Sequence, residues 1–144
     1  MNEDTNAILR AFLVAQTTLT DVVDERIYCP RLPQNATLPA LGFFVRGGVS
    51  TPYIPGIITP SVQFDCWADN PIEAREVYRA LYDILQGIQN QQVLYPFPLV
   101  FPIVFYYRIM SAIEEVQGQD LVDVEIPNHF RVLAFFSFMM RAGN

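Results

Sequence analysis

The clearest pattern in this chain is a change of period in its middle. In the segment VQFDCWADNP, residues 62–71, the apolar Val62, Phe64 and Cys66 alternate with the residues between them. This alternation is the period of a strand with one buried face. We therefore expect a strand here, with the Cys66 side chain pointing into the core.

A helix is expected directly after this strand. Asp69 or Asn70 can cap its N-terminus, Pro71 suits its first position, and Gly87 suits the position that follows its end. Between about 71 and 86 the apolar residues recur at the spacing of one helical face. This face consists of Ala74, Val77, Tyr78, Leu81, Ile84 and Leu85.

The N-terminal part of the chain predicts a further helix and then an extended segment. In residues 8–15 the apolar positions fall at helical spacing. Two acidic residues precede them, and negative charges are favourable at the positive N-terminal end of a helix. A second, short helical turn is expected near residues 20–23. The three prolines within residues 26–39 each disfavour helix at the residue before them, so that this segment should run extended.

Three other segments bear on the sheet. Residues 40–46, ALGFFVR, predict a strand that Gly47 and Gly48 should close, and residues 49–60 then form a loop or a hairpin arm. Prolines at 96, 98 and 102 should prevent regular pairing before a long strand over 103–116, and the sequence QGQDLVD should form a turn after it.

The last strand is expected to place apolar residues on both of its faces. One face would carry Phe130, Val132, Ala134, Phe136, Phe138 and Met140, and the other His129, Arg131, Leu133, Phe135, Ser137 and Met139. The second face is too apolar to contact water throughout. The predicted fold is α+β, a single domain over 1–144 with a mostly antiparallel sheet of about four strands. An N-terminal helix and the helix over about 71–86 would cover one face, and another structure part of the outer face.

The composition of the chain indicates, in addition, that the protein binds a partner. Apolar residues make up 51% of the chain and charged residues only 17%, which favours self-association. The net charge is -6, a balance that repels nucleic acid phosphates. All nine cations are arginines, which suit bidentate pairing at protein interfaces, although ordinary solvated arginines explain them as well.

The sequence does not predict an enzyme, a metal site or a cofactor. The one histidine, His129, opens a strand, and Cys29 and Cys66 lie in or beside apolar segments, away from any base. Glu114 and Glu115 are adjacent in a strand and should point to opposite faces, which makes them poor partners for two-carboxylate chemistry. An acidic N-terminus argues against a signal peptide, and the prolines and glutamines between 84 and 107 argue against a membrane span.

The order of these segments resembles a known family. The stretches RIYCPRLPQNATLPALGFF and VQFDCWADNPIEAREVYRALYDIL, with a helix before them and a strand at the end, resemble the tail terminator and tail-completion (head-to-tail joining) proteins of long-tailed bacteriophages. The resemblance spans roughly residues 7 to 141, and its signature is one of packing. Residues 88–102 depart from the family pattern.

The resemblance implies a structural virion protein of the tail or neck, assembled in the bacterial host cytoplasm. Six copies would form a ring that terminates the tail tube and joins it to the connector proteins of the head, with DNA passing through the lumen without specific binding. We expect residues 49–61 and 94–102 to supply part of the contacts between subunits or with the tail and head. The candidate interface residues are Tyr53, Ile54, Ile57, Tyr95, Phe97, Phe101, Arg31 and Arg46.

Three alternatives stay open at the level of sequence. The same pattern suits a connector or completion protein on the head side of the joint. A monomeric module that binds a host factor is an alternative of a different class. A small enzyme is another, and its activity would have to depend on Cys66 or His129.

Overall fold

The computed structural model describes residues 5–30, 32, 33, 35–50, 57–96, 104–122 and 129–142, and within them three helices and six strands. The helices are α1 (Thr5–Val14), α2 (Thr17–Val23) and α3 (Pro71–Leu85). The strands are β1 (Ile27–Tyr28), β2 (Ala40–Ser50), β3 (Ile57–Ala68), β4 (Gln89–Pro96), β5 (Val104–Val122) and β6 (Phe130–Ala142).

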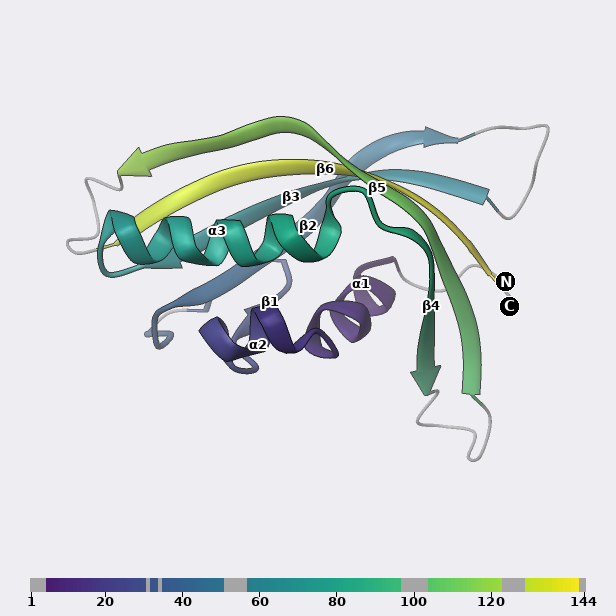
Figure 1. Cartoon of the computed structure of the whole chain (residues 1–144), viewed down its shortest axis with the longest axis horizontal. Coiled ribbons are helices and arrows are strands. Elements are labelled where there is room, and N and C mark those ends of the chain that lie inside the picture. Colours follow the sequence, from purple (N-terminus) through teal and green to yellow (C-terminus); the bar gives the residue numbers. More distant parts are fainter. Residues whose placement is uncertain are drawn as a thin grey trace.

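All six strands belong to one curled sheet, with the order β1-β2-β3-β6-β5-β4 (Figure 1). Four of the neighbouring pairs are antiparallel, and β1 pairs with β2 in parallel. The prediction of about four, mostly antiparallel strands is therefore wrong: the sheet is mixed and contains six strands of the described chain.

Two short or polar strands account for this difference. β1 contains only two residues, too few to show a period, and its place is set by pairing with Leu41 and Gly42. β4 has the sequence QNQQVLYP, which shows no apolar alternation and reaches a proline. It is nevertheless an edge strand, where polar residues and proline are tolerated, and β5 supplies its hydrogen-bonding partner.

Two strands also run past their expected ends. β2 continues through Gly47 and Gly48 with a shift of register, and β5 continues through the predicted turn QGQDLV. Gly118 makes the second continuation possible, because a Cβ there would lie 2.8 Å from Val132 and 2.9 Å from the Tyr78 ring. Three register shifts within β5 accompany the strong bend of this strand in Figure 1.

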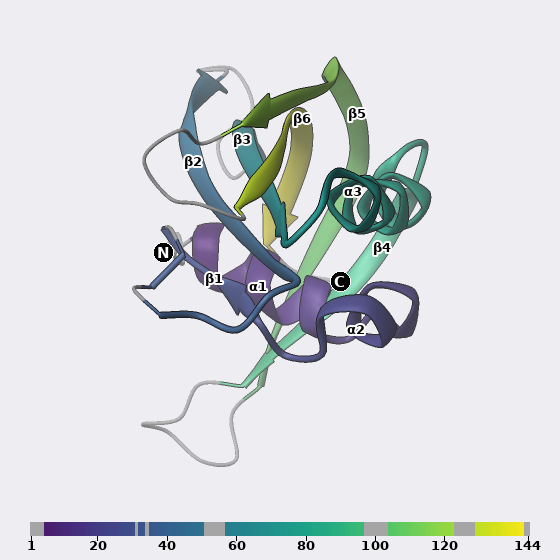
Figure 2. The same cartoon turned by 90° about the vertical axis from the view of Figure 1, so that its left-hand side faces the viewer.

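The helices all lie on one face of the sheet, within its concave side (Figure 2). Local sequence sets the start of α3 as predicted: Asn70 Oδ1 accepts a hydrogen bond of 2.9 Å from the Glu73 backbone N–H, and Pro71 follows. Gly87, with φ of 78°, stands where the helix was expected to stop. No helix in the described part of the chain is long and apolar enough to cross a membrane.

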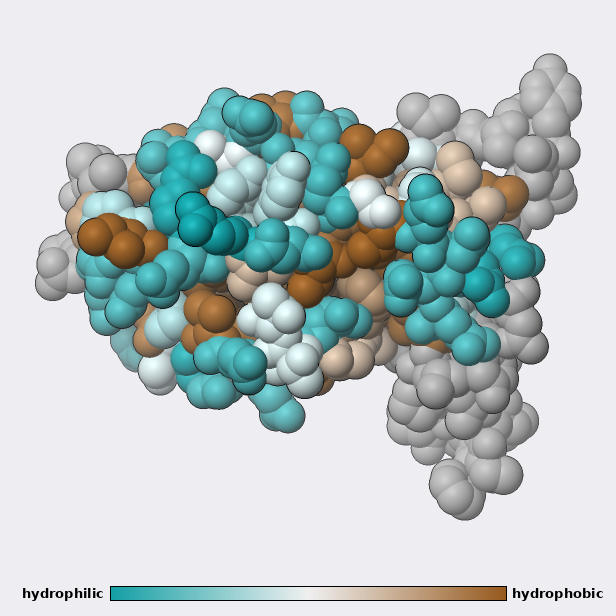
Figure 3. All heavy atoms as spheres, viewed as in Figure 1, coloured by the Kyte–Doolittle hydropathy of each residue, from teal (hydrophilic) through white to brown (hydrophobic). Residues whose placement is uncertain are grey.

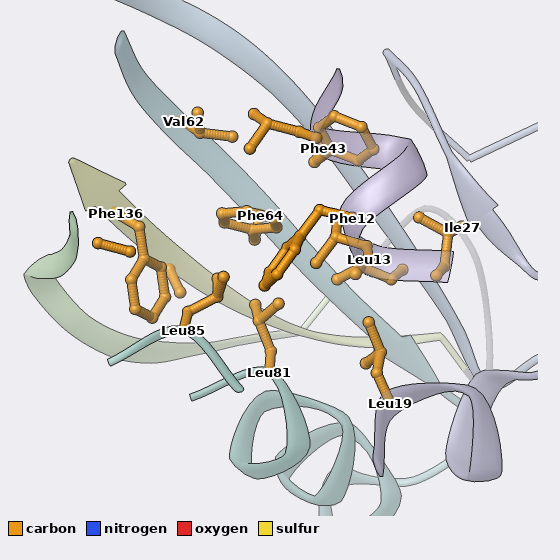
Figure 4. Close-up of a cluster of buried hydrophobic side chains, with 14 of the residues drawn as sticks. Phe12, Leu13, Leu19, Ile27, Phe43, Val62, Phe64, Leu81, Leu85 and Phe136 are labelled. Carbon is orange, nitrogen blue, oxygen red and sulfur yellow. The ribbon is translucent and has the colours of Figure 1, made fainter. Parts of the chain in front are cut away.

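The core lies between the helices and the inner face of the sheet (Figure 4). Cys66 is fully buried, as expected, and the inward residues of β6 all belong to the core or pack against it. The Phe64 ring contacts three other rings, with centroid separations of 6.0 Å to Phe43, 5.7 Å to Phe136 and 6.3 Å to Phe138. Phe12, Leu13, Leu81 and Leu85 complete this cluster from α1 and α3.

Two glycines in β2 provide a matched test of this architecture. Both have positive φ, 108° at Gly47 and 140° at Gly48, so that alanine strains the backbone at either position. A Cβ at Gly47 would meet no atom within 4 Å, whereas a Cβ at Gly48 would collide with the Thr59 carbonyl oxygen of β3. We expect Gly47→Ala to lower the free energy of unfolding by about 1 kcal/mol, and Gly48→Ala by at least about 2 kcal/mol more.

Urea unfolding and amide hydrogen exchange of β2 and β3 measure these effects. Equal costs for the two substitutions would contradict the close packing of the two strands at this point.

Candidate functional site

The most distinctive surface of the molecule is the face of the sheet that points away from the helices, here called the open face. No helix of the described residues lies over it. Its side chains alternate with the buried ones along each strand and meet their neighbours across β2, β3, β6 and β5. In one cross-strand row Phe44, Gln63, Phe135 and Val116 lie side by side.

A polar network crosses the apolar middle of the open face. The Arg46 guanidinium from β2 lies 4.1 Å from the centroid of the Phe135 ring, and its Nε donates to Ser61 Oγ at 2.8 Å. Ser61 Oγ in turn donates to Glu115 Oε1 at 2.6 Å, and Arg46 Nη2 lies 3.4 Å from Glu115 Oε2. Because the arginine and the glutamate are partly exposed, the ion pair itself is worth at most about 1 kcal/mol. Its effect is to hold a cation over an aromatic ring.

A second cluster of the open face contains a buried carboxylate. Asp65 is only 6% exposed, and its Oδ1 lies 3.6 Å from Nη1 of Arg131 without a hydrogen bond. Burial raises the pKa of this carboxyl group, and the positive charge of Arg131 offsets part of the rise. The Arg131 guanidinium also lies 5.1 Å from the centre of the Trp67 ring, and the Trp67 and His129 rings form a T-shaped pair. In this cluster, as in the network around Arg46, an arginine therefore lies over an aromatic ring.

A third polar cluster lies on the opposite side, between α3 and the bend of β5. The hydroxyl of Tyr78 donates to the Glu114 carboxylate and accepts from the Gly118 N–H at 3.2 Å. Burial and this contact with Glu114 raise the pKa of Tyr78 to about 12. Arg75 Nε pairs with Asp120 Oδ1 at 2.9 Å. A groove of about 370 Å³ runs beside them, lined by Arg75, Tyr78, Arg79, Tyr82, Glu114, Gln117 and Gly118. These contacts fasten the bent strand to the helix.

The adjacent pair Glu114 and Glu115 behaves as predicted. Glu114 contacts Tyr78 on the helical side, and Glu115 contacts Arg46 and Ser61 on the open face. The two carboxylates therefore belong to different clusters and do not form a joint site.

The candidates for nucleophilic or metal chemistry are kept apart. Burial raises the pKa of the Cys66 thiol well above its usual range, and the thiol therefore stays protonated inside the core. Cys29 is half-buried near β1, and His129 lies against Trp67 at the start of β6. Within the described ranges, no group of three His, Cys, Asp or Glu side chains is arranged to hold a metal ion.

The predicted interface residues fall in different parts of the structure. Arg46 belongs to the network of the open face, and Ile57 begins β3 opposite Arg141 of β6. Tyr95 lies in β4 opposite Phe105. Arg31, Tyr53, Ile54, Phe97 and Phe101 lie outside the described residues. The interface role of this set remains a prediction.

Sequence reasoning missed much of the open face. The apolar second side of β6 signalled it, since Leu133, Phe135 and Met139 were expected to avoid water. Ile113 and Val116 of β5 were not singled out, although both are exposed. Register shifts between Ile109 and Ser111 and between Glu114 and Val116 place Ile113 and Val116 on this face, and no periodicity in the sequence reveals such shifts.

Tyr78 and Tyr82 give a test of the contact between α3 and β5. Tyr78→Phe removes a donor to Glu114 and an acceptor for the Gly118 N–H, and we expect it to lower the free energy of unfolding by about 1–3 kcal/mol. Tyr82→Phe, one turn later at an exposed position, is the matched control and should change it by less than about 0.5 kcal/mol. Urea denaturation of both variants checks this, and equal effects would argue against the contact.

Asp65 gives a test by pH. Its pKa is raised above 3.8 on folding, so that the folded state binds its proton more tightly than the unfolded state does. The contribution of Asp65 to stability should therefore fall as pH rises from about 4 through the raised pKa, and then stay constant. Asp65→Asn removes this titration, and the stability of the variant relative to the natural chain should increase over the same window. Urea titrations at a series of pH values measure it, and a constant difference would contradict it.

Comparison with known proteins adds no family to these observations: no family model matches the chain, and no curated protein sequence matches it.

Proposed function

We propose that this chain is a structural virion protein of a long-tailed bacteriophage. Six copies form a ring that terminates the tail tube and joins the tail to the connector of the head. The observation that carries the proposal is the open face of the sheet, which exposes apolar side chains of β5 and β6 and has no helix of the described chain over it. Such a face favours a protein that works by contact with other protein subunits.

The two long hairpins support the same function. β2 with β3, and β4 with β5, extend past the helical layer toward one end of the molecule in Figure 1. A ring of identical subunits needs one surface on each subunit that meets a different surface on the next. Hairpins that reach past the body of a subunit are suited to such contacts, and the sequence predicts this role for residues 49–61 and 94–102.

The charge of the chain suits a subunit around a DNA channel. The net charge of -6 disfavours tight binding to phosphates, and DNA can then pass through the lumen without adhering to it. The partners of the ring are the tail tube protein on one side and the head connector on the other.

The first experiment measures native mass by light scattering after size exclusion, at two concentrations and two salt strengths. We expect a discrete species of about six subunits that appears as a ring in negative stain. Added to polymerising tail tube protein, the ring should shorten the tubes by capping their growing ends. A strict monomer that also leaves the tube length unchanged would overturn the proposal.

Deletion of residues 51–58 tests the hairpin contacts. Among the described core residues the deletion removes only Ile58, which is partly buried and packs against the core. The variant should therefore keep its helical and strand signals in circular dichroism, and should no longer assemble. Gln91→Ala, an exposed change in β4, is the control and should assemble normally. Unchanged assembly after the deletion would remove this hairpin from the contacts of the ring.

A further inference from the structure

The charges of the described chain are divided between its two sides. The layer formed by α2, α3 and their flanking residues, 17–26 and 69–86, carries seven carboxylates and three arginines, a net charge of -4. The carboxylates are Asp21, Asp24, Glu25, Asp69, Glu73, Glu76 and Asp83. In Figure 3 the surface over α3 is mostly hydrophilic, with isolated apolar patches.

The open face has the opposite charge. Its described residues include four arginines and two carboxylates, a net charge of +2. The arginines are Arg46, Arg108, Arg131 and Arg141, and the carboxylates are Asp65 and Glu115. Register places Arg108 beside Arg141, on the side opposite the buried Ile109 and Met140.

Exposed apolar side chains occur on the same two surfaces. Among the described residues, five large apolar side chains are exposed. They are Ile72 (73%) and Tyr82 (38%) on α3, and Ile113 (57%), Val116 (41%) and Met139 (38%) on the open face. Each surface therefore combines apolar groups that can be buried with a charge opposite to that of the other.

We propose that the open face of one copy of this chain docks on the outer side of α3 of a second copy. The contact buries Ile113, Val116 and Met139 against Ile72 and Tyr82. Arginines of the open face approach the carboxylates of the α2 and α3 layer, among them Glu76 and Asp83. This inference rests on the self-association in the proposed function and identifies the two surfaces that meet.

The charges favour this arrangement over a symmetric one. Two open faces brought together would oppose two positive surfaces, and two α3 surfaces would oppose two negative ones. A contact between unlike surfaces leaves one free surface of each kind on the pair, to which further copies can add until a ring closes. Because the open face and the α3 surface attract each other by charge, we also expect weaker association at high salt.

Two variants test the contact, one with a change on the α3 surface and one with a change on the open face. Ile72→Ser removes the exposed apolar group of α3 without adding to the negative charge of that surface, and Ile113→Asp places a negative charge on the open face; both positions are exposed in the single chain, so that folding should be unaffected. We expect each variant alone to self-associate at least about tenfold more weakly than the natural chain. Gln91→Asp, exposed on the edge strand β4, is the matched control and should associate normally.

Mixing the two variants is the decisive step. The open face of Ile72→Ser and the α3 surface of Ile113→Asp are both intact, so that the mixture should form a one-to-one heterodimer and nothing larger. Light scattering and analytical ultracentrifugation measure this. A mixture that stays monomeric, or an Ile72→Ser variant that assembles fully, overturns the contact while leaving a ring of another geometry possible. A natural chain that is monomeric at high concentration overturns the contact, whereas the proposed capping function is decided separately by tube length.

Discussion

The structure depends on one buried side of the sheet, at the centre of which lies a cluster of phenylalanine rings around Phe64. Phe64 of β3 packs against Phe43 of β2 and against Phe136 and Phe138 of β6, and this joins three neighbouring strands into one surface. The helices cover the same surface with residues such as Phe12 and Leu81 (Figure 4). Removing an aromatic side chain from such a site typically costs about 3–5 kcal/mol, which is a large part of the stability of a small domain.

The burial of the inner face leaves the outer face with a different chemistry. Because neighbouring residues of a strand point to opposite sides, the residues between the buried ones must lie on the open face. There the chain places arginines over aromatic rings, Arg46 on Phe135 and Arg131 on Trp67, and the cations cover part of the apolar area. Ile113, Val116 and Met139 remain exposed, and a second subunit can bury them.

The bend of β5 relates the two faces to each other. Tyr78 and Arg75 hold the strand on the helical side through Glu114, Gly118 and Asp120, while Glu115 points to the other side. One strand thus contributes to the α3 layer and to the open face, and a change in its register would alter both. The proposed head-to-tail contact uses these two surfaces, so that the shape of β5 would affect the curvature of a ring.

The sequence by itself determined the elements whose signals are local. The alternation around Cys66, the cap at Asn70, the stop at Gly87 and the two faces of β6 all depend on residues within one turn or one strand. Tertiary structure alone decided that β1 pairs with β2 and β4 with β5, and that β5 continues as a strand through Gly118. It also decided the contacts among Arg46, Ser61 and Glu115. These features join segments far apart in the chain: Glu115 lies 54 residues from Ser61. Their stability comes from a partner strand or a packed neighbour, and a strand such as QNQQVLYP has no apolar period of its own to reveal it.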